Sequence, residues 1–287
     1  MKKINLIITI LFLSLVVFFS AKIITAQGTR IALDEIIEDI PEQWWDGGWN
    51  KIEELTNFIQ QNQHKNQEVL AKAQYWIGCN YYAIREHKRA IAAFAAIMEK
   101  YPESWLACAK AQFEIGQVNL HRLYDYNNAL SAYTKVLREY PECEVSAQAQ
   151  RMIAYTYFQM KDYAKAKGEY EKVWQNYPNV KMEAAKAYWE LGEMLFQQCF
   201  EPGITDKEKN QKVKESLSAY KQAYLYCPSD EADVSEWTID SIVRAFKYLD
   251  CNTTRADQFI QYQRYIKTGD NSAYSADAVI IDPLKDF

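Results

Sequence analysis

The sequence predicts an all-α fold in which antiparallel helix pairs stack side by side into a solenoid. The first observation behind this prediction is an eight-residue frame, approximately Ala-Lys-Ala-Gln-aromatic-x-Ile-Gly, that occurs four times. The frame begins at Ala71, Ala109, Ala147 and Ala185. Self-similarity at a fixed interval is typical of stacked repeats, so it indicates the fold class before any single helix is considered.

The second observation is the pattern that follows each frame. A small residue, an aromatic residue, an apolar or small residue and a proline follow one another at offsets of 4, 3 and 5. Offsets of 3 and 4 place side chains on one stripe of a helix, and the proline, which lacks an N–H, ends that helix. The four series are Ala90, Phe94, Ile97, Pro102; Ala129, Tyr133, Val136, Pro141; Ala166, Tyr170, Val173, Pro178; and Ser216, Tyr220, Ala223, Pro228.

Together these motifs resemble the tetratricopeptide repeat (TPR), and the resemblance covers about Asn66 to Asp250. It implies a right-handed α-solenoid of stacked antiparallel helix pairs. Gly78 and Ala90 lack bulk, so the two helices of the first unit are expected to approach closely, with Phe94 filling the gap toward the next unit. No single unit buries its apolar face alone, and its neighbours supply the core.

The spacing between repeats is longer than in the common TPR pattern. Pro102, Pro141 and Pro178 are followed by six, five and six residues before the next frame, where the common pattern leaves about two. The first helix of each unit is therefore expected to carry an extra turn. With the recurring Tyr-Pro ending, this form is similar to TPR proteins of bacterial envelopes, such as the Tol-Pal-associated periplasmic protein and the lipoprotein of outer-membrane assembly.

Residues 1–26 are predicted to be a signal peptide. Lys2 and Lys3 precede an apolar run from Ile4 to Phe19, and Ala26 offers a small residue for cleavage. A retained membrane anchor is the alternative. The first cysteine is Cys79, so the lipoprotein route is not expected. Cleavage would remove three lysines and no acid, and the formal charge would go from −5 to −8. Such an acidic chain argues against a nucleic-acid partner.

The remaining segments are expected to cap the repeats. Residues 27–65 form an N-terminal capping segment in which the tryptophans of Trp44–Trp49 either seal the first helix pair or form an exposed aromatic platform. Four units occupy 66–230, with a Pro-Gly insertion after Phe200, and 231–267 form a capping helix pair. Residues 268–287 form a tail that is either flexible or docked through Val279–Leu284.

No catalytic, metal or cofactor motif is present in the sequence. There is no His-Glu-x-x-His, no Gly-rich phosphate loop, no Gly-x-Ser-x-Gly elbow and no Cys-x-x-Cys. The six cysteines are not spaced as a compact disulfide framework, so at most one pair is expected to be bridged. We therefore expect a protein that is not an enzyme and carries no cofactor or metal.

The TPR resemblance implies a ligand-binding groove lined by the first helices of the units. The family's groove positions within the frame are the second, fifth, ninth, twelfth and thirteenth. The residues at these positions that we select as partner-binding candidates are Lys72, Tyr75, Tyr82, Lys110, Phe113, Gln117, His121, Arg151, Tyr155, Lys186, Trp189 and Glu193. The same positions also hold Phe158, Gln159 and Gln197. Columns of cations beside aromatics suit an extended peptide with acidic and apolar side chains. The alternative is that the aromatics form the core between repeats and the lysines are solvated.

Two functions remain open at this point. The first is a non-catalytic, exported TPR scaffold of the periplasm or outer membrane that binds a partner protein or peptide and positions a cell-envelope complex. The second is an accessory or regulatory subunit of an extracytoplasmic enzyme, such as a redox enzyme. The fold does not decide between them.

Overall fold

The computed structural model describes residues 48–141, 143–227, 232–250, 254–268 and 284. The predicted signal peptide and the tryptophans before Trp49 lie outside these residues. In the described part of the chain, every element is a helix, and none of these helices combines the length and apolarity needed to cross a membrane. The chain divides between Val118 and Asn119 into two compact units.

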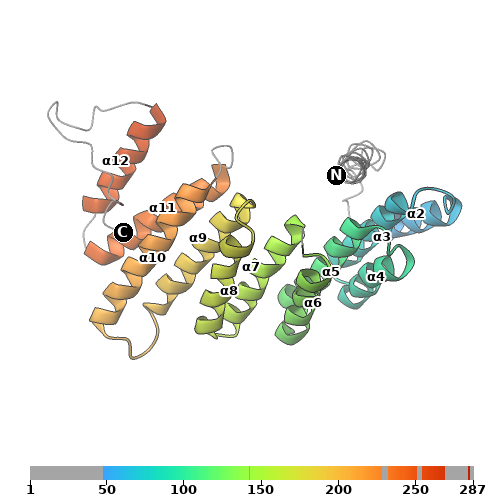
Figure 1. Cartoon of the computed structure of the whole chain (residues 1–287), viewed down its shortest axis with the longest axis horizontal. Helices are drawn as coiled ribbons and strands as arrows, with labels where there is room; N and C mark the ends of the chain where they lie inside the picture. The colour runs from blue at the N-terminus through green and yellow to red at the C-terminus, as the bar shows by residue number, and fades with distance from the viewer. Residues whose placement is uncertain (1–47, 142, 228–231, 251–253, 269–283, 285–287) are drawn as a thin grey trace, which may run out of the picture. The chain divides into compact units, whose positions relative to one another are not determined.

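In residues 48–118, the described part of unit 1, four helices pack in chain order (Figure 1). They are α2 (Trp49–Gln61), α3 (Gln67–Ala83), α4 (His87–Lys100) and α5 (Trp105–Val118). Helix α3 packs against both α4 and α5, so it buries apolar residues on two sides. Ile52 and Leu55 of α2 close one end of this core by packing on Ile77 of α3.

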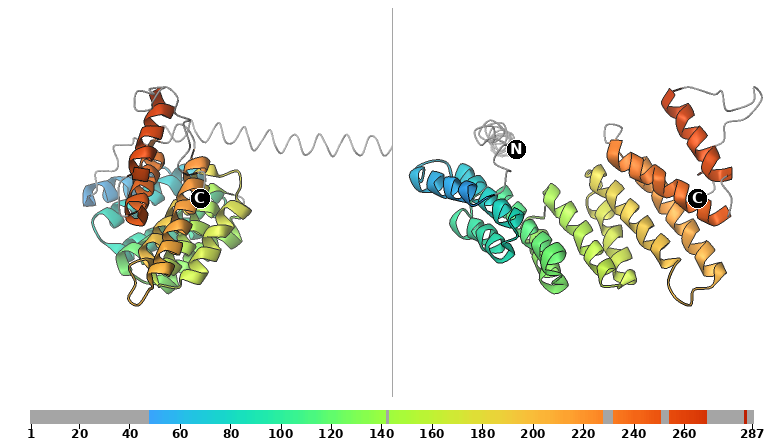
Figure 2. Two further views of the ribbon diagram at one scale, coloured as in Figure 1. Left: turned by 90° about the vertical axis from the view of Figure 1, so that its left-hand side faces the viewer. Right: turned by 180° about the vertical axis from the view of Figure 1, so that it is seen from behind.

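Unit 2 begins with a short π-helix, η2 (Asn119–Leu123), and its described residues continue as seven α-helices (Figures 1 and 2). They are α6 (Tyr126–Glu139), α7 (Glu144–Gln159), α8 (Tyr163–Asn176), α9 (Lys181–Gln198), α10 (Asp206–Tyr226), α11 (Ala232–Asp250) and α12 (Thr254–Thr268). Each α-helix packs on the next. Helix α9, the first helix of its pair, also contacts the first helices of the pairs before and after it, α7 and α11. This is the packing of a TPR-type solenoid, as the sequence predicts.

The extra turn at the start of each first helix is confirmed. Helices α3, α5, α7 and α9 begin three or four residues before their frames. The second helices end on the predicted tyrosines, where the amide N–H of Tyr101, Tyr140 and Tyr177 bonds to the carbonyl oxygen four residues earlier. The proline that follows each tyrosine cannot continue the helix.

The close approach of Gly78 to its helix partner is also confirmed. A Cβ placed on Gly78 would lie 2.5 Å from the ring of Phe94, and one on Gly192 would overlap the ring of Tyr220. These rings are buried, together with Tyr133 and Tyr170 at the equivalent positions. In these two helix pairs the frame glycine makes room for the aromatic residue, whereas the third frame has Ala154 at this position.

A buried glutamine ties the two helices of a pair together in both units. The amide nitrogen of Gln74 donates to the backbone carbonyl of Ala93 at 3.2 Å, and that of Gln150 donates to the carbonyl of Glu169 at 3.3 Å. Both bonds join residues 19 apart, so they repeat with the frame. A buried amide needs such partners, since leaving it unsatisfied costs about 1–3 kcal/mol.

Each unit has side-chain contacts at one end of its described elements. Trp49 packs edge-on against Tyr81 at 5.9 Å, and the guanidinium of Arg89 lies 5.1 Å above its ring. Trp49 is nevertheless 52% exposed, so these contacts cover only part of its ring. In unit 2, Leu284 is buried among residues of α9 to α12, and its carbonyl accepts from Lys221 Nζ at 2.7 Å. The tail is therefore docked at Leu284.

Candidate functional site

In unit 1 the candidate residues lie on α3 and α5. The phenol of Tyr75 donates to Glu114 Oε1 at 2.9 Å and so joins the two helices. Burial raises the pKa of Tyr75 well above its ordinary value, so the phenol stays protonated at neutral pH. Partial burial, and then the nearby charge of Lys110, lower the pKa of Lys72. The two lysines are therefore close enough to repel each other, and Lys110 is exposed.

Three other unit 1 candidates are half-buried. Tyr82 is half-buried, with its ring 6.1 Å from that of His87, and Phe113 and Gln117 are half-buried on α5. Cys79 is free, and burial raises the pKa of its thiol to about 12. A thiol that stays protonated at neutral pH is a weak nucleophile.

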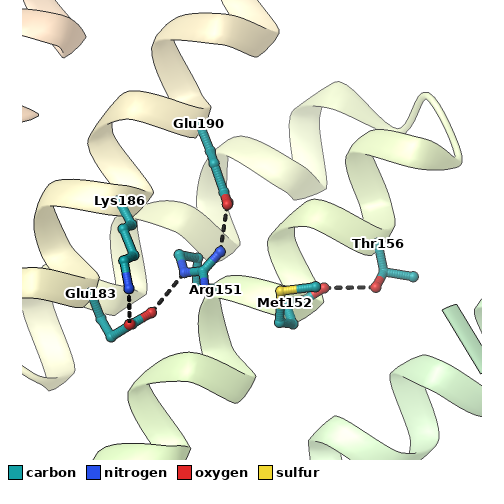
Figure 3. Close-up of polar contacts among 6 residues, drawn as sticks. All are labelled: Arg151, Met152, Thr156, Glu183, Lys186 and Glu190. Atoms are coloured by element: carbon teal, nitrogen blue, oxygen red, sulfur yellow. Dashed lines mark hydrogen bonds and ion pairs between the residues drawn. The ribbon is translucent and has the colours of Figure 1, made fainter. Parts of the chain in front are cut away.

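In unit 2 the candidate cations are engaged within the protein. Arg151 of α7 lies between two glutamates of α9: Nε donates to Glu183 at 2.7 Å, and Nη1 donates to Glu190 (Figure 3). Lys186 donates to the other oxygen of Glu183 at 3.2 Å. The side chains of Arg151 and Glu183 are only 15% and 3% exposed. We call these four residues the α7–α9 ion network.

The ion network changes the charge that the sequence predicts for the groove positions of α7 and α9. Burial opposes ionisation of Glu183, but Arg151 and Lys186 outweigh it and hold the pKa of Glu183 below its ordinary value. Burial raises the pKa of Glu190 although Arg151 acts in the opposite direction. The network contains two cationic and two acidic residues. Arg151 therefore differs from the expectation of a cation that attracts an acidic ligand, because its charge is taken up by glutamates of the neighbouring helix.

A pocket of about 540 Å³ opens beside the network, between α7 and α9. It is lined by aromatic rings, side-chain amides, two glutamates and one lysine: Tyr155, Phe158, Gln159, Lys161, Tyr163, Trp189, Glu190, Glu193 and Gln197. Three of the predicted candidates, Tyr155, Trp189 and Glu193, thus meet in one pocket. His121 lies beside this group, with its ring 6.0 Å from that of Tyr155. Burial and then Arg122 lower the pKa of His121, so it is neutral at pH 7.

The α9 wall of the pocket is fixed by hydrogen bonds from neighbouring helices. Trp189 Nε1 donates to Ser241 Oγ at 3.1 Å, and the Ser241 hydroxyl donates to Glu193 Oε1 at 2.7 Å. Tyr220 donates to the same oxygen at 2.8 Å, and Arg244 donates to it as well. Trp189 and Glu193 are therefore held in place before any ligand arrives, which lowers the entropy lost on binding.

Lys161, Tyr163 and Glu190 were not among the sequence candidates. Lys161 and Tyr163 lie at the turn into α8, outside the first helices to which the frame positions belong. Glu190 occupies the sixth frame position, as Glu114 does in unit 1, and each accepts from a residue 39 positions earlier, Arg151 or Tyr75. The repetition of glutamate at that position is the signal that indicates an inter-helix bond.

Among the described residues, no cluster of His, Cys, Asp or Glu has the geometry to hold a metal ion. The five described cysteines are all free thiols.

Comparison with known families supports the repeat assignment. A family model described as tetratricopeptide repeat matches residues 72–104, which hold most of α3 and α4. The chain therefore contains tetratricopeptide repeats. A second model, for the YfiO family described as an outer membrane lipoprotein, matches residues 106–231 and so spans α5 to α10. The pocket and the ion network both lie within that second match.

Solved structures support the fold alone. The chain is similar to the crystal structure of BtubC (BKLC) from P. vanneervenii, with a TM-score of 0.53 and 12% identity over 80% of this chain and 94% of that one. No curated protein matches the chain.

Proposed function

We propose that this TPR protein is a non-catalytic scaffold of the bacterial cell envelope that binds an extended segment of a partner polypeptide in the pocket between α7 and α9. The observation that carries this proposal is the pocket itself, with its amides exposed and its rings half-buried while Arg151 is paired with glutamates within the protein. Rings and side-chain amides can hold a peptide's side chains and backbone, whereas nothing in the pocket supplies a nucleophile beside a base.

The cellular location is part of the proposal. The match to the outer membrane lipoprotein family supports an envelope-associated protein, and the apolar N-terminal segment supports export into the periplasm. In this scheme the four units in 66–230 provide the binding surface, and the pair in 231–267 closes the array. The partner is a protein or peptide, and the acidic chain disfavours nucleic acid.

The experiment is affinity capture from the native envelope followed by mass spectrometry, with matched variants. Gln197 is exposed on the pocket wall, so Gln197→Arg fills the opening without removing a core contact. Gln175 is equally exposed on α8 and lies outside the pocket, so Gln175→Arg is the control.

We expect the wild-type protein and Gln175→Arg to capture the same partner and Gln197→Arg to lose it, with helical circular dichroism unchanged in all three. Undiminished capture by Gln197→Arg would rule out the pocket. Capture of a cofactor-bearing enzyme would identify the scaffold as that enzyme's accessory subunit.

A further inference from the structure

The pocket between α7 and α9 has the composition of a site for a positively charged side chain. Four aromatic residues line it: Tyr155 and Phe158 from α7, Tyr163 from α8 and Trp189 from α9. An aromatic face attracts a cation within about 6 Å of its centre, and arginine and tryptophan form the strongest such pairs. Unit 2 already contains this contact in two other places, Arg244 over Phe196 at 4.9 Å and Lys165 over Tyr157 at 5.2 Å.

A carboxylate oxygen is available beside these rings. Glu193 accepts from Tyr220, Ser241 and Arg244, and all three bonds end on Oε1. None of these three bonds uses Oε2, and Glu193 lines the pocket. A carboxylate fixed at one oxygen and open at the other can accept one or two N–H groups of an ammonium or guanidinium.

Two cations near the pocket are already ion-paired with the glutamates that line it: Arg151 with Glu190, and Arg244, which is 49% exposed, with Glu193. Arg151 is bonded to Glu183 and Glu190, and its side chain is 15% exposed. Arg244 is bonded to Glu193 from α11 and is not among the residues that line the pocket. Of the charged residues that do line it, two are glutamates and one, Lys161, is a cation at the exposed turn before α8.

We propose that this pocket receives a lysine or arginine side chain of the bound polypeptide, stacked on the aromatic rings and donating to Glu193 Oε2, so that Glu193 would be shared between this side chain and Arg244, as Glu183 is shared between Arg151 and Lys186. The exposed amides of Gln159 and Gln197 each offer donors and an acceptor to the backbone of the same segment. This inference rests on the proposed function. It reverses the preference for acidic side chains that the sequence predicts for this part of the chain.

The test is a titration of the full chain with acetylated and amidated Gly-Ser-Xaa-Ser-Gly peptides, in which Xaa is Arg, Lys, Leu or Glu. The readout is the ¹H–¹⁵N resonance of the Trp189 indole, assigned with Trp189→Phe. We expect the Arg and Lys peptides to shift it saturably, with the Arg peptide binding about fivefold more tightly than the Glu peptide.

Two charge reversals sharpen the titration. Lys161→Glu removes the cation that lines the pocket, so it is expected to tighten binding of the Arg peptide about threefold. Lys135→Glu makes the same charge change on the exposed surface of α6, outside the pocket, and is expected to leave binding unchanged.

The inference is overturned if the Leu or Glu peptide binds more tightly than the Arg peptide, if no peptide shifts Trp189, or if Lys161→Glu weakens binding. In each of these cases, loss of partner capture in Gln197→Arg would still support the pocket as the binding surface. Failure of both experiments would remove the proposed function as well.

Discussion

In both compact units, residues at the same frame positions join the first helices of successive pairs, but the contacts they make differ. In unit 1 a neutral phenol, Tyr75, bonds to Glu114 at the sixth position of the next frame, while Lys72 and Lys110 lie near each other. In unit 2 the equivalent pair is Arg151 and Glu190, and Glu183 joins it. The repeat geometry thus fixes which positions meet. The residue types at these positions decide whether a cation is left exposed or is paired with glutamates of the neighbouring helix.

The two units also differ in which helices line their pockets. In unit 1 a pocket of about 500 Å³ lies among α2, α3 and α4, with Ile77, Tyr81 and Arg89 in its lining. In unit 2 the pocket lies between the first helices α7 and α9. The comparison favours unit 2 as the place where the first-helix face is open to a ligand.

Breaking the ion network is expected to have the largest effect on stability. Arg151→Ala would leave Glu183 and Glu190 buried without their cation, which costs about 3–5 kcal/mol. Since repeats contact only their neighbours, hydrogen exchange should accelerate in α7–α9 and not in α2–α4. The triple variant Arg151→Met, Glu183→Leu, Glu190→Leu should recover most of the loss, and its failure to do so would contradict this account of the network.

Filling the space of a frame glycine is expected to have the next largest effect. The methyl group of Gly192→Ala would overlap the Tyr220 ring, and overpacking of this kind costs about 1–3 kcal/mol. A Cβ placed on Gly168 in α8 would have no atom within 4 Å, so Gly168→Ala should instead stabilise by about 0.5–1 kcal/mol. Urea unfolding measures both, and equal effects at the two glycines would count against the packing described here.

Removal of the phenol in unit 1 is expected to have a smaller effect. Tyr75→Phe deletes the bond to Glu114 and keeps the ring, so the loss should be about 1–2 kcal/mol. Hydrogen exchange should report it in α3 and α5. A loss of stability as large as that of Arg151→Ala would contradict the distinction drawn here between the Tyr75–Glu114 hydrogen bond and the Arg151–Glu190 ion pair.

The pH dependence of the free energy of unfolding should also differ between the wild-type protein and a variant of the ion network. Because the folded pKa of Glu183 is lowered, its contribution is present above the unfolded pKa of about 4.3 and is lost as the pH falls through the folded value. Glu183→Gln should therefore lose less stability than wild type between pH 5 and pH 3. Equal losses in urea unfolding at these pH values would contradict the role given to Arg151.

The fold could be predicted from sequence because its determinants are local and repeated. The frame glycines, the aromatic residue that fills each pair and the Tyr-Pro endings each recur at fixed spacing, and each has the predicted place in the structure. The extra turn of each first helix follows from the length between proline and frame.

The site could be predicted only in part. Tyr155, Trp189 and Glu193 were found because the frame gives the face of the helix on which a residue lies. The frame does not give the partner of a charge. Arg151 is neutralised by Glu183, which lies two residues before the frame in the extra turn, a position that the TPR groove pattern does not include.

The most direct test of the central claim is hydrogen exchange of the full chain, alone and bound to the partner captured from the envelope. We predict new protection in α7 and α9 around Tyr155–Gln159 and Trp189–Gln197, the segments that line the unit 2 pocket. Protection confined to α2 and α4, with no change in α7 and α9, would contradict the claim.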